Sequence, residues 1–105
     1  MAESFSTVPG VLTFQTGGID VLTRVDFPNA ARKVRIVFTA SDGKIATEGT
    51  DGAPIGAAAY WKAVADTEVE VFVDRDASEG GKGPASLYLT SGAATVTVTL
   101  LCEAG

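Results

Sequence analysis

The acidic side chains are the main candidates for chemistry in this 105-residue chain, because it contains no histidine. Without histidine the commonest general base is missing, and so are the nucleophilic triads built on it and most transition-metal sites. Two pairs of carboxylates could act on glycosidic bonds: Glu68 with Glu70, and Asp74 with Asp76. The members of each pair alternate along an expected strand, which is typical of a solvated face. We therefore predict no catalytic residue and expect that the protein is not an enzyme.

Residues 74–83 (DRDASEGGKG) are the one stretch that could hold an ion. Asp74, Asp76 and Ser78 stand at the first, third and fifth positions of an EF-hand calcium loop. That loop requires Gly at its sixth position and Glu at its twelfth, where this chain has Glu and Ala. GGKG also lacks the Ser or Thr that follows the lysine of a phosphate-binding loop. We predict a hairpin tip with no metal and no cofactor; a cation held by Asp74, Asp76 and Glu79 in another geometry is the alternative.

Two adjacent aromatic residues, Tyr60 and Trp61, stand in a region of small side chains. On a strand they would point to opposite faces, so we expect one in the core and the other at least partly exposed. An exposed ring could anchor a protein partner or stack on a sugar. Core packing with ordinary edge exposure, an interface anchor and a sugar contact all stay open.

Half of the eight basic side chains fall within residues 24–35 (RVDFPNAARKVR). They are Arg24, Arg32, Lys33 and Arg35. One interpretation is a solvated or salt-bridged patch, and the other is a docking surface for an acidic partner. The net charge of −5 argues against non-specific nucleic-acid binding, which requires a positive face.

The chain length and the cysteine count set the class of protein. A chain of 105 residues forms one domain with a modest core. Its single cysteine, Cys102, excludes an internal disulfide, and its place in a terminal strand predicts a buried, unreactive thiol. The first ten residues do not have the pattern of a signal peptide, and no stretch has the length of a membrane helix. We expect a protein made in a reducing cytoplasm, with no membrane partner.

Alternation with a period of two residues dominates the chain and predicts strands. In the strongest strand Val34, Ile36 and Phe38 form one face, and further on Val69, Val71 and Val73 do the same. Twelve glycines supply the tight turns that such a fold needs. The expected fold class is all-β: a single-domain antiparallel β-sandwich, jelly-roll-like, of about eight short strands.

Three local expectations are less direct. In residues 19–25 the alternation places Ile19, Val21, Thr23 and Val25 on one face, with Leu22 on the other. Residues 44–59 read as a short strand and a long surface loop, and 57–65 favour a strand over two helical turns. The segments 86–90 and 94–101 read as a closing hairpin joined by Ser-Gly-Ala, with Val96, Val98 and Leu100 on its buried face. The uncharged threonine face of that hairpin offers nothing to repel a pairing strand.

The second half of the chain resembles small structural proteins of tailed bacteriophages. The resemblance covers residues 59–103 and is carried by the order YWKAVADTEVEVFVD followed by SLYLTSGAATVTVTLLCEAG. A weaker similarity lies in VRIVFTASDGKIAT. The resemblance implies a virion component assembled in the host bacterial cytoplasm, foremost a capsid decoration (cement) protein. It also implies a homo-oligomer, with a trimer favoured, and the major capsid protein or another virion protein as partner.

Two other functions stay open: a tail, neck or fibre-base subunit, and a carbohydrate-binding β-sandwich. We expect an N-terminal arm over residues 1–10, including Phe5, that could add a strand to a neighbour, and a sandwich domain over residues 11–105. The predicted partner-binding residues are Phe5, Arg24, Arg32, Lys33, Arg35, Tyr60 and Trp61.

Overall fold

A computed structural model describes residues 3–5, 9–28, 31–57, 59–73, 86–93 and 95–103. This part of the chain forms nine strands and no helix, which confirms the all-β prediction. The strands are β1 (Glu3–Ser4), β2 (Gly10–Gln15), β3 (Thr23–Asp26), β4 (Lys33–Phe38), β5 (Gly43–Ala46), β6 (Trp61–Ala63), β7 (Val69–Phe72), β8 (Ser86–Ser91) and β9 (Thr97–Glu103).

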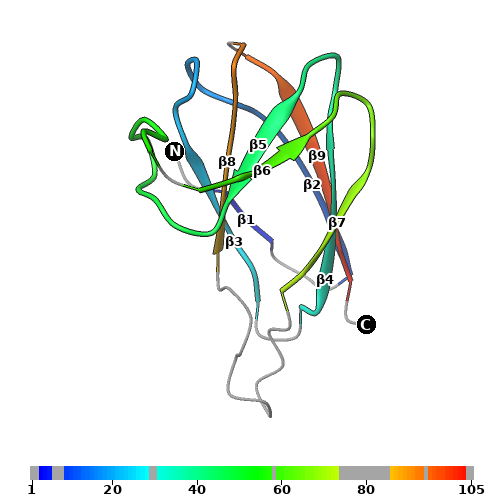
Figure 1. Ribbon diagram of the computed structural model, residues 1–105. Helices are drawn as coiled ribbons and strands as arrows, with labels where there is room; N and C mark the ends of the chain where they lie inside the picture. The colour runs from blue at the N-terminus through cyan, green and yellow to red at the C-terminus, as the bar shows by residue number, and fades with distance from the viewer. Residues whose placement is uncertain are drawn as a thin grey trace.

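The strands lie in two facing sheets (Figure 1). Sheet A has the order β1-β3-β8-β5-β6, and sheet B has the order β2-β9-β4-β7. All strand pairs are antiparallel except β1 with β3. Without β1, the chain order within the sheets is that of an eight-stranded jelly roll, so the sandwich prediction is confirmed at the level of topology.

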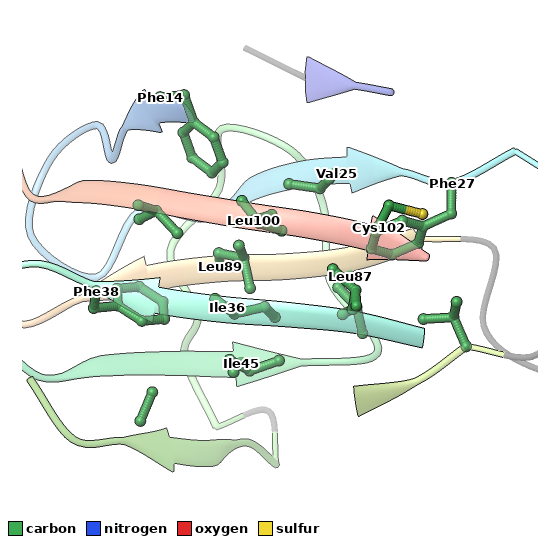
Figure 2. Packing of buried hydrophobic residues seen from close by; sticks show 14 of the residues in the cluster. Phe14, Val25, Phe27, Ile36, Phe38, Ile45, Leu87, Leu89, Leu100 and Cys102 are labelled. Carbon is green, nitrogen blue, oxygen red and sulfur yellow. The ribbon is translucent and has the colours of Figure 1, made fainter. Parts of the chain in front are cut away.

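The core lies between the sheets and follows the predicted alternation (Figure 2). Val34, Ile36 and Phe38 of β4 are fully buried, as predicted. Sheet A contributes Ile45, Leu87 and Leu89 from the facing side. The predicted row of Val96, Val98 and Leu100, which begins one residue before β9, is buried and is followed by Cys102. Two sheets whose inner side chains interdigitate give a dry core about 10 Å thick.

The predicted closing hairpin is wrong, although both of its strands exist. β8 pairs with β3 and β5 in sheet A, whereas β9 pairs with β2 and β4 in sheet B. Apart from the β5–β6 connection, every step along the chain crosses from one sheet to the other. The Ser91–Gly92 turn is therefore a crossing between layers, in which the Ser91 hydroxyl accepts a hydrogen bond from the Ala93 N–H at 3.2 Å. Both edges of β9 are covered by strands of the same chain.

The segment before β3 also departs from its predicted alternation. Leu22 lies on the face opposite Val25, as expected, but it is buried, and Ile19 is 61% exposed rather than in the core with Val25. Asp20 has a φ of 57°, a left-handed conformation that breaks the period of two before the strand begins. Leu22 joins Ala46 and Ile55 in a second small cluster on the outer side of sheet A, beneath the loop that follows β5. The predicted short strand and long loop are both present.

The described residues of the expected N-terminal arm lie against the sandwich. Glu3 and Ser4 pair with Val25 and Asp26 of β3. The ring of Phe5 stacks on that of Phe27 with 5.7 Å between the centroids. Phe5, a predicted partner-binding residue, is thus partly buried against the core of its own chain.

Candidate functional site

Large apolar side chains are exposed where both sheets end on the same side of the sandwich. β6 is the last strand of sheet A, and β7 is the last strand of sheet B. The chain passes from one to the other through the turn at Val64–Thr67, where the Asp66 N–H donates to the Phe38 carbonyl at 2.8 Å (Figure 1). Trp61, Val64 and Phe72 are 54%, 56% and 69% exposed along this side. We call it the β6–β7 edge.

Trp61 lies at the mouth of the space between the sheets. It pairs in register with Ile45, whose side chain is fully buried between the sheets, so Trp61 starts from the same inner face. Across from it, Val69 and Val71 of β7 are only partly buried against the core. These three side chains line a hollow of about 340 Å³ that is open to solvent, together with Phe72 and the charged residues Lys62 and Glu70. We call this hollow the edge slot.

The prediction that one of Tyr60 and Trp61 lies in the core is wrong, because Tyr60 is 49% and Trp61 54% exposed. β6 begins only at Trp61, so Tyr60 precedes the regular alternation. Trp61 does point inward, but β6 and the facing strand β7 are each the last strand of their sheet, and no described strand lies beyond them to cover the ring. An inward position at the edge of a sandwich therefore leaves the side chain half exposed.

Tyr60 faces a second, more polar hollow of about 420 Å³. The Lys44 ammonium lies 5.1 Å from the centre of the Tyr60 ring and donates a hydrogen bond to Asp20 at 2.8 Å. The hydrogen bond to Asp20 raises the pKa of Lys44. Asp42 accepts a hydrogen bond from the Ala65 N–H at 2.8 Å, which lowers the pKa of this carboxyl. The ring, the two cations Lys44 and Lys62 and the carboxylates that pair with them give this hollow the chemistry of a small polar-ligand site.

Two of the predicted basic residues lie side by side on the outer face of β4. Arg35 pairs with Glu103 at 2.9 Å, with Glu68 at 3.6 Å and with Glu70 at 3.7 Å. Lys33 lies 3.7 Å from Glu70. The salt-bridged interpretation fits this pair, because each cation already faces acids of its own chain.

The other two basic residues are placed differently. Arg24 lies on β3 in sheet A, where its Nε is 3.0 Å from Asp26 and its N–H donates to Asp51. Arg32 immediately precedes β4, and its carbonyl accepts from the Val73 N–H at 2.9 Å. The four predicted basic residues therefore do not form one surface, because Arg24 belongs to the other sheet.

The candidates for chemistry find no further support in the described residues. Glu68 and Glu70 are exposed on one face, as expected, and both approach Arg35. Asp74, Asp76, Ser78 and Glu79 lie outside the described residues. Within those residues no group of three potential metal ligands comes together. Cys102 is buried, as predicted, and burial raises the pKa of its thiol.

Sequence reasoning missed Val64, Phe72 and the edge slot. The sequence feature that could have indicated this surface was Phe72, an aromatic residue on the same outward face of β7 as Glu70. A large apolar side chain on the polar face of a strand indicates an interaction surface when it lies beside others.

A comparison of the chain with family models, curated proteins and solved structures gave no match. The described part contains no helix that is long and apolar enough to cross a membrane.

Proposed function

We propose that this protein is a non-enzymatic structural component of a tailed-phage particle, a capsid decoration protein that binds the major capsid protein. Two observations support this function. The sequence of residues 59–103 resembles small structural proteins of such phages, and the fold is a jelly roll, an architecture found among viral capsid proteins and lectins alike. The same fold serves both kinds of protein, so the function has to be inferred from the exposed surface.

The observation that carries the proposal is the β6–β7 edge. Trp61, Val64 and Phe72 are all more than half exposed there, and Trp61 and Phe72 both line the edge slot. Aromatic side chains that protrude from a rigid sheet are typical anchors of protein interfaces. Native proteins ordinarily protect such an edge, and no described strand pairs with β7 on this side, so the exposed apolar side chains are best explained by a partner that covers them.

Decoration requires modest contacts repeated many times. A standard interface buries roughly 800 Å² on each partner, and repeated copies on one shell add avidity. A small rigid sandwich meets that need without any catalytic group. The predicted trimer would strengthen attachment further, because each trimer would present three copies of the same edge.

The test uses shells assembled from the major capsid protein of the phage whose genome encodes this chain. The purified chain should sediment with shells that lack it, and the bound amount should saturate at a fixed ratio. Trp61→Ala should weaken binding about tenfold or more, as expected for an interface anchor, whereas Tyr60→Ala should change it little. An absence of co-sedimentation, together with a purely monomeric chain in light scattering, would contradict the proposal.

A carbohydrate-binding function is the second candidate, and the hollow at Tyr60 is the observation that favours it. The ring lies beside Lys44, Asp20 and Asp42, so stacking and hydrogen bonding to a sugar are both available. A glycan array discriminates the two functions. Hits that disappear in Tyr60→Ala and persist in Trp61→Ala would support sugar binding at this hollow, and the capsid function predicts no hits.

A further inference from the structure

We propose that the free side of β7 accepts an extended segment of the partner protein as an additional antiparallel strand of sheet B. This segment carries apolar side chains toward the edge slot and basic side chains on the outer face. The inference deepens the proposed function and rests on its premise that the protein acts by binding another protein. It adds the place, the binding mode and the chemistry of the bound segment.

The backbone of β7 is the first support. The Val73 N–H bonds to the Arg32 carbonyl, on the β4 side. N–H and C=O groups alternate in direction along a strand, so Val69 and Val71 also bond toward β4. The N–H and C=O groups of Glu70 and Phe72 therefore point away from β4, to a side where no other described strand pairs with β7. These four groups are the template onto which an extended chain can add.

The shape of the slot is the second support. β6 and β7 are the last strands of their sheets on this side, and the half-exposed ring of Trp61 lines the edge slot together with Val69 and Val71. Val69 and Val71 are only partly buried on the same inner side. A strand added beside β7 would place alternate side chains over these three residues and close the sandwich. Those inward side chains must be apolar, because they complete the core.

The outer face determines the charge of the occupant. Glu70 of β7 and Glu68, which immediately precedes this strand, are exposed, with 43% and 52% of their side chains accessible. Arg35 and Lys33, which approach them, lie on the β4 side; Lys62 of β6 also lines the edge slot, but its ammonium pairs with Asp42 at 3.5 Å. A Lys or Arg on the added strand would lie opposite or diagonal to Glu70, where unlike charges stabilise strand pairing. The net charge of −5 also favours a basic segment during approach.

A second copy of this chain fits the same edge poorly. In a symmetric antiparallel pairing centred on Glu70, two Glu70 carboxylates stand opposite each other. A pairing centred on Val69 sets Glu68 against Glu70 of the other copy. A pairing centred on Val71 sets Glu70 beside Phe72 and brings no cation. Like charges directly opposite one another destabilise strand pairing, so the structure favours a different, basic segment.

The experiment uses a capped synthetic peptide of about nine residues in which valine and lysine alternate, and a control peptide in which valine and glutamate alternate. Binding is followed by NMR hydrogen exchange of the ¹⁵N-labelled full chain and by the fluorescence of Trp61, its only tryptophan. The lysine peptide should slow exchange at the Glu70 and Phe72 amides by about tenfold or more and shift Trp61 emission to the blue. The Val69 and Val71 amides should change much less, because they already donate to β4.

Two charge-matched variants separate a specific site from general attraction between opposite charges. Glu70→Lys and Glu48→Lys change the net charge equally, and both positions are exposed. Glu48 lies in the loop after β5 and is not one of the residues that line the edge slot. Glu70→Lys should weaken lysine-peptide binding about tenfold, whereas Glu48→Lys should leave it within about twofold. Equal losses in the two variants would overturn the proposed site.

Three further results would overturn the inference. The first is unchanged exchange at Glu70 and Phe72 when the peptide is saturating. The second is equal binding of the glutamate peptide. The third is protection of the same two amides that rises with chain concentration without peptide, since a second copy would then be the occupant. Shell binding that survives both Trp61→Ala and Glu70→Lys would refute this inference alone, whereas peptide binding without shell binding would refute only the capsid function.

Discussion

Gly43→Ala is the substitution whose effect follows most directly from the core geometry. Gly43 begins β5, and a Cβ added there would lie within 3.0 Å of three ring atoms of Phe38, closer than real Cβ atoms approach. The Phe38 ring is fully buried, so it has no free space into which it could move. Overpacking of this kind costs about 1–3 kcal/mol. Alanine recovers about 0.4–1 kcal/mol by restricting the unfolded chain, which leaves a net loss of about 1–2 kcal/mol.

Gly92→Ala is the matched control, because nothing lies within 4 Å of the Cβ it would add. Urea unfolding, followed by circular dichroism, should show Gly43→Ala destabilised by about 1–2 kcal/mol and Gly92→Ala unchanged or slightly more stable. The melting temperature of Gly43→Ala should fall by about 5–15 °C. The urea m-value should stay constant in both variants, because the surface exposed on unfolding is the same.

A double-mutant cycle identifies the cause of the loss. Phe38→Leu makes room beside residue 43, so Gly43→Ala should cost about 0.5–2 kcal/mol less in that background. The reasoning fails if Gly43→Ala is no more damaging than Gly92→Ala. It also fails if the penalty is the same with Phe or Leu at position 38, since the clash would then not be its source.

Ile36→Ala removes a fully buried side chain and should lower the free energy of unfolding by about 2–5 kcal/mol. Val71→Ala, at the partly buried edge, should lower it clearly less. Equal losses of stability in chemical denaturation would contradict the assigned core. The Arg24 backbone N–H donates a hydrogen bond to the Asp51 carboxylate at 2.9 Å and lowers the pKa of Asp51. The stability that the ionised Asp51 carboxylate contributes is therefore present above about pH 4 and is lost as the pH falls through the lowered pKa of the folded state. Asp51→Asn should therefore flatten the acid end of the stability–pH curve, and an unchanged acid limb would refute this role. Cys102 is buried with a raised pKa, so a thiol reagent at pH 8 should react slowly with the native chain and rapidly in denaturant; fast native labelling would contradict its burial.

The strands that sequence patterns predicted correctly are those whose two faces differ clearly. In β4 the apolar row of Val34, Ile36 and Phe38 alternates with Lys33, Arg35 and Val37, so the core face is unambiguous. The same holds for Val96, Val98 and Leu100, which alternate with threonines. Period-two patterning specifies which side of a strand is buried, and it does so without knowledge of the neighbouring strands.

Pairing partners could not be predicted in the same way. A short Ser-Gly turn between two strands is compatible both with a hairpin and with a crossing between layers. The choice depends on β2 and β4, which flank β9 and exclude β8 from that sheet. Pairing that depends on competition between distant segments cannot be predicted from the local sequence. The left-handed conformation of Asp20, next to the exposed Ile19, is likewise not predicted by the hydropathy pattern.

The candidate site was predicted only in part for the same reason. Trp61 was identified as a possible anchor from its residue type alone. Its partners in the edge slot, Val69 and Val71, were read as an ordinary buried face. Their incomplete burial follows from the position of β7 at the end of a four-stranded sheet, which is a property of topology rather than of local sequence.

The most direct test of the central claim is hydrogen exchange of the chain while it is bound to capsid shells, resolved by peptide mass spectrometry. Binding through the β6–β7 edge predicts slower exchange in the segment from Trp61 to Val73, with little change in β2 at the opposite edge of sheet B. Bound chain with protection confined to β2 or to the Tyr60 hollow would contradict the assigned surface. Failure to bind the shells would contradict the function itself.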